Sequence, residues 1–358
     1  MSLIDQLVET VSTLAPITLS VPTTPIFQVS RFIHHVTTTP IHPVYFPYLR
    51  FGVIHAVRVT TVWAGLKKGK KRGGRLQDLF GYLALAWGGS TVTSLLLNQP
   101  PSWLVSPTPW IIYPLIYTLL VPTGLSAYIV DTCPTLLFGI IGGLVDGMTR
   151  GTTITSLATL LSSSSIGSSA ISADGSINLW TYALLSLLAI SSGGLIVGAL
   201  GLSEDEWKLG TPGLLKGGLI NTLDAWSASL VGLLWLTLTN QNSSLKPINE
   251  FIQSSLPHEL KSSTSSSLSS DEKIAGDILD VPHARAICVM VLGTLLATKA
   301  TILYVIGNKT KKVNKVDKKT ELFILDEKDK EKTKVVKTPV KIGSSKPTPR
   351  KSPRAKSK

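Results

Sequence analysis

The sequence predicts an all-α polytopic membrane protein with seven transmembrane helices, arranged as two inverted three-helix repeats plus a seventh helix. Three observations lead to this fold class. Only 16% of the 358 residues are charged, and the mean hydropathy is +0.28. Seven apolar stretches each approach the roughly 20 residues that cross a bilayer as a helix. Two of these stretches carry a pair of adjacent glycines at matching places.

Positive charge is concentrated at the C-terminal end. The formal net charge is +13, and residues 309–358 alone contribute +12, from 18 Lys and Arg against 6 Asp and Glu. A nearly neutral apolar body followed by a basic segment is typical of a membrane domain with a solvated tail. We therefore expect residues 307–358 to form a basic, disordered cytosolic tail, which either solubilises the chain or contacts anionic lipid.

The remaining segments follow in order along the chain. Residues 1–43 are rich in Pro, Thr and Val without a clear period, and they predict an N-terminal lumenal arm. A seven-helix transmembrane domain is expected over 44–306, with a Ser-rich lumenal loop at 240–282. The expected spans are approximately 44–66, 78–98, 109–130, 135–160, 179–201, 213–239 and 284–306. The first span is the weakest, because Arg50, His55 and Arg58 interrupt it, unless the two arginines flank a short or tilted helix.

The charges of the connecting loops predict the orientation. The loop Lys67–Arg75 carries six positive charges, whereas the stretches 98–108 and 161–178 contain no Lys or Arg. Positively charged loops remain on the cytosolic side, so this pattern places the N-terminus in the lumen and the C-terminus in the cytosol. Asn242-Ser243-Ser244 has the pattern of a glycosylation acceptor and falls on the lumenal side in this topology.

The glycine pairs suggest an internal repeat. Gly88 and Gly89 lie in the second span, and Gly193 and Gly194 lie in the fifth. Glycine weakens a helix interior by about 1 kcal/mol relative to alanine. If spans one to three and four to six form two units, an odd number of spans makes the repeat inverted. Interrupted helices at matching positions then indicate a permeation or binding site, and close helix packing is the alternative explanation.

Ionisable residues inside the spans are the other candidate site residues. Asp146 and Arg150 lie one helical turn apart in span four, and they form either part of a pore or a self-neutralising pair. Asp224 and Lys299 are the other deep charges. They either pair with each other, or Lys299 extends to the membrane interface.

Several other functions find no support in the sequence. The two cysteines, Cys133 and Cys288, lie in or beside apolar stretches and are expected to be small buried side chains. No HExxH, Walker loop or nucleophile elbow is present, so no catalytic residue, metal ligand or cofactor is expected. His34, His35 and His42 are expected at the surface. The Lys-rich tail lacks the interleaved aromatic residues of a nucleic-acid-binding segment.

Four stretches of the chain resemble the trimeric intracellular cation (TRIC) channel family, of which this chain would be a divergent member. They are WGGSTVTSLLLNQPPSWL (Trp87 to Leu104), DTCPTLLFGIIGGLVDGMTR, SSGGLIVGALGL, and LLATKATILY with Lys299. Their order covers roughly residues 44–310. Gln99 stands where the family usually has Glu, and the long Ser-rich loop is additional.

The resemblance implies a homotrimer whose subunits each contain a pore for potassium or other monovalent cations. In the family this flow balances calcium release across the endoplasmic or sarcoplasmic reticulum. The resemblance also implies a phosphoinositide headgroup contact at Arg150. However, Asp146 replaces an expected Lys and Ile190 another expected basic residue, so an acidic side chain would instead attract cations directly.

Three functions therefore remain open from the sequence. The first is a potassium channel of an intracellular membrane, with pore or gating residues Gly88, Gly89, Asp146, Arg150, Gly193, Gly194 and Lys299. The second is a secondary transporter or proton-coupled carrier on the same inverted repeat, with Asp146 as the titrating group. The third is a non-conducting membrane scaffold in which the basic tail is the functional part.

Overall fold

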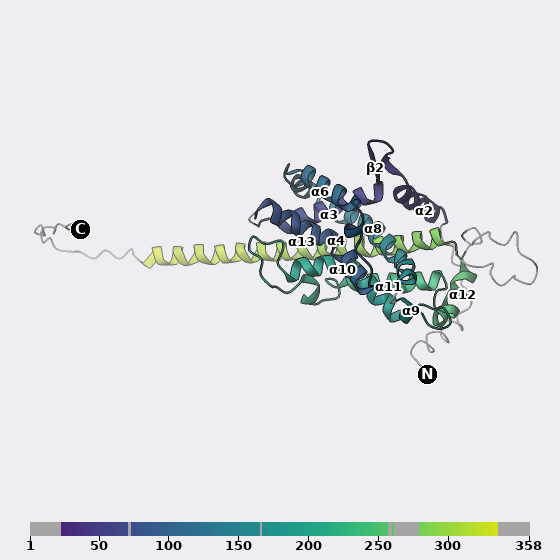
Figure 1. Ribbon diagram of the computed structural model, residues 1–358. Helices are drawn as coiled ribbons and strands as arrows, with labels where there is room; N and C mark the ends of the chain where they lie inside the picture. The colour runs from purple at the N-terminus through teal and green to yellow at the C-terminus, as the bar shows by residue number, and fades with distance from the viewer. Residues whose placement is uncertain (1–22, 71–72, 165–166, 257–259, 261–278, 336–358) are drawn as a thin grey trace, which may run out of the picture. The chain divides into compact units, whose positions relative to one another are not determined.

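The computed structural model describes residues 23–70, 73–164, 167–256, 260 and 279–335, which are mostly helical (Figure 1). The chain divides into two compact units, one ending at Tyr304 and the other beginning at Val305. The elements are α2 (Thr23–Thr38), β1 (Pro40–His42), β2 (Phe46–Leu49), α3 (Arg50–Lys67), α4 (Arg75–Leu96), α5 (Ser102–Val105), α6 (Thr108–Leu120), α7 (Leu125–Thr132), α8 (Thr135–Ser163), α9 (Gly167–Ala170), α10 (Leu179–Ala199), η1 (Gly213–Lys216), α11 (Leu223–Leu238), η2 (Ser243–Leu245), α12 (Lys246–Ser255) and α13 (Val281–Val335).

Three helices among the described residues are long and apolar enough to cross a membrane. They are α4, α10 and the part of α13 from Val281 to Asn308. A fourth candidate is the pair α6 and α7, which meets the same criterion together but bends by 65° at a short break. These helices are consistent with an integral membrane protein.

The other three predicted spans form helices that do not reach this criterion. Helix α3 carries Arg50, Arg58 and Lys67, and α8 carries Asp146 and Arg150 among many glycines and threonines. Helix α11 is apolar but only 16 residues long. The positions of the seven stretches thus correspond to helices, whereas a seven-span topology stays a prediction.

The end of the predicted N-terminal arm is helical, although its sequence shows no clear period. Residues 1–22 lie outside the described part, but α2 is a regular helix that buries Ile26, Ile33 and Val36. These apolar residues recur on one face of the helix, and the ring of Phe27 packs edge-on against His283 at 4.7 Å between centroids. An antiparallel hairpin, β1 with β2, then leads directly into α3.

The two glycine pairs lie where α4 and α10 cross. Neither helix is interrupted there, so the expected break at the glycines is absent. A methyl group added at Gly89 would clash with the carbonyl oxygen of Ala189, and one added at Gly193 would clash with that of Leu85. In both cases the contacted carbonyl lies four residues before the glycine on the other helix. A reciprocal contact of this kind is what a local two-fold axis between the helices produces.

Helices α8 and α13 are joined by a second close crossing. Gly139, Gly143, Gly147 and Gly151 recur every four residues along α8, so they form one stripe on the helix. Added methyl groups there would meet, in turn, Ala300, Leu296 with Ala297, Gly293 and Val289 of α13. The descending order shows that the two helices run antiparallel, and the small residues let their backbones approach closely.

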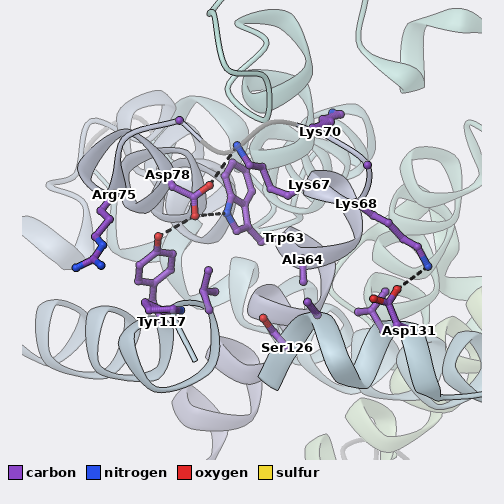
Figure 2. A pocket seen from close by; sticks show the side chains of 16 residues that line it. Trp63, Ala64, Lys67, Lys68, Lys70, Arg75, Asp78, Tyr117, Ser126 and Asp131 are labelled. Carbon is purple, nitrogen blue, oxygen red and sulfur yellow. Dashed lines mark hydrogen bonds and ion pairs between the residues drawn. The ribbon is translucent and has the colours of Figure 1, made fainter. Parts of the chain in front are cut away.

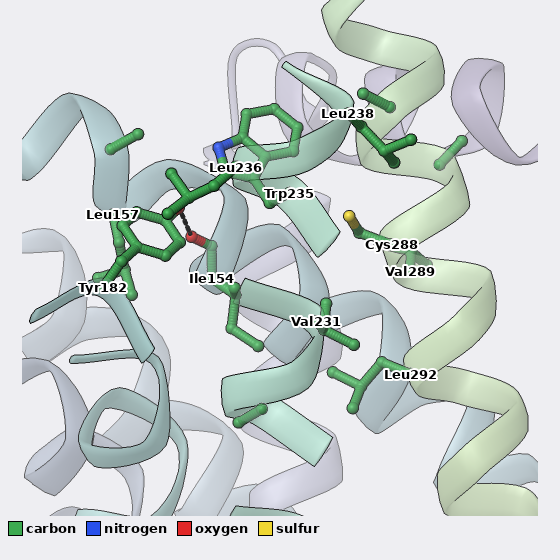
Figure 3. Packing of buried hydrophobic residues seen from close by; sticks show 14 of the residues in the cluster. Ile154, Leu157, Tyr182, Val231, Trp235, Leu236, Leu238, Cys288, Val289 and Leu292 are labelled. Carbon is green, nitrogen blue, oxygen red and sulfur yellow. Dashed lines mark hydrogen bonds between the residues drawn. The ribbon is translucent and has the colours of Figure 1, made fainter. Parts of the chain in front are cut away.

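Apolar side chains fill the space between α8, α10, α11 and α13. Figure 3 shows Leu157, Val231, Leu236 and Leu292 turned toward this shared interior. Cys288 is buried in the same cluster, as expected, whereas Cys133 is exposed, contrary to the prediction. The packing holds together the helices that carry the charged residues described below.

The sequon at Asn242 is not accessible in the folded chain. Its side chain is buried, and its Nδ2 atom donates a hydrogen bond to the carbonyl oxygen of Ile177 at 2.7 Å. Its Oδ1 atom accepts from the backbone amide of Ser244 at 2.9 Å. Because Nδ2 is the atom that would carry a glycan, glycosylation there no longer supports the lumenal position of the loop. Most of the Ser-rich stretch, 257–259 and 261–278, lies outside the described residues.

The second unit begins within α13. This helix continues to Val335, although residues from 307 onward were expected to be disordered. The long run of Lys and Glu in this stretch has good helix propensity, which explains the difference. Residues 336–358 lie outside the described part of the chain.

Candidate pore cavity

A cavity of about 750 Å³ lies among the helices of the first unit. We call it the central cavity. Its wall includes residues of α3, α4, α6, α8, α10, α11 and α13, so it is assembled from most of the chain. Its charged lining residues are Arg58, Asp146, Arg150, Asp224 and Lys299.

These five side chains form one continuous series, which we call the ionic chain. Cationic and anionic groups alternate along it, and its members come from α3, α8, α11 and α13. Three cations and two anions leave the series with one net positive charge. Alternating charges stabilise each other where the surroundings exclude water.

Arg58 and Asp146 make the shortest contacts of the ionic chain. Arg58 donates from Nε to Asp146 Oδ1 at 2.9 Å and from Nη2 to Oδ2 at 2.7 Å, so both carboxylate oxygens are engaged. Their side chains are only 17% and 14% exposed. A two-point arginine–carboxylate pair of this kind fixes geometry as well as charge.

Helix α8 forms the binding site of the Arg58 side chain. The ring of Phe138 lies 5.9 Å from the guanidinium carbon, and Asp146 accepts its hydrogen bonds. Between them is Gly142, where an added methyl group would lie 2.9 Å from the same guanidinium carbon. Because these residues are spaced by four, the helix presents an aromatic ring, an open space and a carboxylate in one line.

The other half of the ionic chain is looser. Arg150 lies 3.8 Å from Asp146 and 3.7 Å from Asp224, measured between guanidinium nitrogen and carboxylate oxygen. Lys299 Nζ donates to Asp224 Oδ2 at 2.8 Å. Lys299 thus pairs with Asp224, the first of the two arrangements that the sequence left open. Asp146 and Arg150 do face each other, but the close partner of Asp146 is Arg58.

The structure brings most of the predicted site residues to one place. Those that line the central cavity are Gly89, Asp146, Arg150, Gly193, Gly194 and Lys299. Gly88 is not part of the lining, and a methyl group added there would lie 2.7 Å from the Cα atom of Gly193. Gly194 differs from its neighbour, because an added methyl group would meet no atom within 4 Å.

Sequence reasoning missed the role of two lining residues on α3. Arg58 had been considered as an interruption of the first span or as a helix flank, and His55 as an interruption alone. The His55 ring nitrogen Nδ1 lies 2.7 Å from the hydroxyl oxygen of Tyr113, which also lines the cavity. The spacing of Phe138, Gly142 and Asp146 is the signal from which an arginine partner could have been inferred.

The fold and the cavity together define a class of protein. The described residues form a helical bundle with three or four candidate membrane spans, consistent with an integral membrane protein, and a charged cavity lies inside it. Comparisons with protein-family models, curated proteins and solved structures find no match to the chain.

Proposed function

We propose that the chain is a channel for potassium or other monovalent cations in an intracellular membrane, and that the central cavity is part of its pore. One observation carries the proposal. Six of the seven residues that the sequence singled out as pore or gating residues line a single cavity, although they come from four different helices. The TRIC-like motifs described above agree with this function.

Inverted architecture is part of the same proposal. The reciprocal contact of Gly89 and Gly193 supports a two-fold relation between the α4 and α10 regions. In the proposed fold this relation extends to two three-helix repeats, with α13 as the seventh span. The helices α3, α8 and α11 then span the membrane in contact with their neighbours, which shield their charged side chains from lipid.

The ionic chain suggests how the pore is controlled. A passing cation needs oxygen ligands, and the oxygens of Asp146 and Asp224 already accept hydrogen bonds from Arg58 and Lys299. In the proposed mechanism this arrangement is non-conducting, since its net positive charge also repels cations. Conduction begins when Lys299 or Arg58 moves away and leaves a carboxylate free.

Other properties of the proposed channel come from the resemblance alone. They are the homotrimer, the location in the endoplasmic reticulum or another endomembrane, and counter-ion flow during calcium release. The lumenal N-terminus and cytosolic C-terminus come from the loop charges. A phosphoinositide headgroup at Arg150 would compete with Asp146 and Asp224, the two carboxylates between which this side chain lies.

Potassium flux into liposomes tests the proposal. Full-length protein is reconstituted, and wild type is compared with D146N, R150Q and the control E206Q. Glu206 is an exposed carboxylate paired with Lys208 outside the central cavity. We expect D146N to lower the flux, because it adds one net positive charge to the ionic chain. R150Q should raise the flux, because it removes one positive charge, and E206Q should behave as wild type.

Three results would contradict the channel. Absence of potassium flux under any voltage or calcium concentration would exclude conduction. Saturable flux that requires a proton gradient would instead support the proton-coupled carrier. The third result concerns a variant in which Gly88, Gly89, Gly193 and Gly194 are replaced by leucine. If this variant folds and keeps its cellular activity, the non-conducting membrane scaffold would be favoured over the channel.

A further inference from the structure

A second cavity, separate from the central one, lies at the ends of α3 and α4. Its volume is about 490 Å³, within the range of small-molecule sites, and we call it the basic pocket. Figure 2 shows its cationic lining residues Lys67, Lys68, Lys70 and Arg75, with Lys68 and Arg75 on opposite sides of the pocket. Lys71 and Arg72 of the same loop lie outside the described residues.

The carboxylates of the basic pocket do not balance its positive charge. Among its described lining residues, Asp78 and Asp131 are the only carboxylates, against four cationic side chains. Asp78 is occupied by neighbouring side chains: its Oδ2 atom accepts from Trp63 Nε1 at 3.2 Å and from Tyr117 Oη at 2.7 Å. Its Oδ1 atom has no hydrogen-bond partner among the described residues but forms an ion pair with Lys67 Nζ at 3.3 Å. Because Lys70 pairs with Glu204, which is not a lining residue, one positive charge of the described lining, that of Arg75, is left without a carboxylate partner.

Two of the cations are available to a ligand. The Arg75 guanidinium is exposed and has no hydrogen-bond or ion-pair partner among the described residues, and Figure 2 draws it without any contact. Lys68 pairs with Asp131 at 2.7 Å, but both side chains are about 60% exposed. An exposed pair contributes little stability, so a stronger anion could replace the aspartate. Lys70 is held near the opening by Glu204 and Ser203.

The remaining wall of the basic pocket is apolar and comes from the bend between α6 and α7. It includes Val121, Pro122, Ala127 and Val130. At the bend Gly124 has a φ of +78°, a conformation that residues with a side chain rarely adopt. The bend thus places an apolar surface opposite the basic loop, so that a ligand with a charged and an apolar part would contact both.

The position of the basic pocket also fits such a ligand. It lies at the N-terminal end of α4, one of the candidate membrane spans, and therefore at the expected level of lipid headgroups. Clusters of Lys and Arg between helix ends at this level bind anionic headgroups. Arginine binds phosphate oxygens through two parallel hydrogen bonds, and lysine binds them as a point charge.

We propose that the basic pocket binds a phosphate group, offered by the headgroup of an anionic phospholipid or by a free phosphate ester. Lys68, which lies beside α7 through its pair with Asp131, binds the phosphate, and the wall formed by the α6–α7 bend holds the adjoining glycerol and acyl portion. Arg75 lies on the opposite side of the pocket and adds to its positive potential. This site is distinct from the lipid contact expected at Arg150, and it does not depend on the channel function.

Native mass spectrometry of the full-length protein in detergent tests the proposal. The probes are dioleoyl phosphatidic acid, dioleoyl phosphatidylcholine and glycerol 3-phosphate. Wild type is compared with K68Q/R75Q and with K208Q/K216Q, which removes the same charge from two exposed lysines outside the pocket. The basic C-terminal segment is identical in all three proteins, so binding to it cancels in the comparison.

We expect wild type to retain phosphatidic acid in preference to phosphatidylcholine. K68Q/R75Q should lower the affinity for phosphatidic acid at least about tenfold, as loss of charge-assisted bonds to phosphate implies, and K208Q/K216Q should leave it unchanged. A127L narrows the pocket without a change of charge and should weaken lipid more than glycerol 3-phosphate if the lipid is the ligand. If A127L weakens the binding of phosphatidic acid and of glycerol 3-phosphate equally, the ligand is a free phosphate ester.

The proposal is overturned if K68Q/R75Q binds both phosphate-bearing probes as wild type does. It is also overturned if K208Q/K216Q loses as much affinity, because the binding would then depend on overall charge. Thermal unfolding of each variant in the same detergent shows whether it is folded. A127L keeps the proposal testable if the double variant does not fold.

Discussion

Single residues determine the charge of the central cavity. The contact between Arg58 and Asp146 could not be predicted from the sequence. In the sequence Arg58 is a charge that weakens an apolar span, and its partner Asp146 lies 88 residues away. A local pattern indicates that Asp146 and Arg150 share a helix face, but it does not reveal which residue of another helix comes closest. The tertiary arrangement of α3 against α8 settles that question.

Gly142 leaves the space in which Arg58 pairs with Asp146. In G142A the new methyl group would displace the guanidinium of Arg58, because the two would lie 2.9 Å apart. Because the contacted atoms belong to the end of a flexible side chain that can shift, we expect a loss of about 0.5–1.5 kcal/mol of stability as the hydrogen bonds weaken. Thermal unfolding in detergent measures the loss.

Two comparisons make this prediction specific. G65A is the matched control, since an added methyl group at Gly65 meets no atom within 4 Å. In a D146N background the effect of G142A should largely disappear, because the pair is already broken. A melting temperature of G142A equal to that of G65A would contradict the role of Gly142.

At the scale of elements, the sequence predicted where helices lie better than how they meet. The expected spans correspond to α3, α4, α6 with α7, α8, α10, α11 and α13. The glycine pairs were interpreted as interruptions, yet α4 and α10 are continuous and the glycines permit close packing. The cost of a glycine depends on the helix that lies opposite, which a single sequence does not show.

Two adjacent glycines of α10 should therefore respond differently to the same substitution. G193A should destabilise the protein by about 1–3 kcal/mol, because its methyl group clashes with the Leu85 carbonyl oxygen and forces α4 and α10 apart. G194A should be neutral or stabilising by up to about 1 kcal/mol, since the space is open and alanine favours a helix. Thermal unfolding distinguishes them, and similar melting temperatures would exclude the close crossing.

At the scale of the whole molecule, hydropathy and function conflict. The helices that fail the membrane-span criterion include α3 and α8, which supply Arg58, Asp146 and Arg150 to the central cavity. A charged residue that lines the cavity also lowers the mean hydropathy of the helix that carries it. The sequence therefore predicts the apolar helices α4, α10 and α13 most clearly, and it is least clear about α3 and α8, which supply three of the five charges of the ionic chain.

The first unit alone should carry the proposed activity. Truncation after Asn308 retains the apolar part of α13 and Lys299, so we expect potassium flux into liposomes to equal that of the full chain. Truncation before Val281 removes Cys288 and Leu292 from the core and should abolish folding and flux. Loss of potassium flux in the protein truncated after Asn308 would show that the second unit takes part in conduction.

Helix α8 carries two adjacent stripes with different tasks, and this constrains how its sequence can change. Phe138, Gly142, Asp146 and Arg150 form the stripe that faces the charges, and the four glycines of the second stripe each lie one position later and face α13. A single inserted or deleted residue at the start of α8 would rotate the helix by about 100°. Larger side chains would then face α13, and Asp146 and Arg150 would lose their ion-pair partners. The sequence of α8 can therefore change by substitution at some positions, but not by an insertion or deletion that shifts the two stripes.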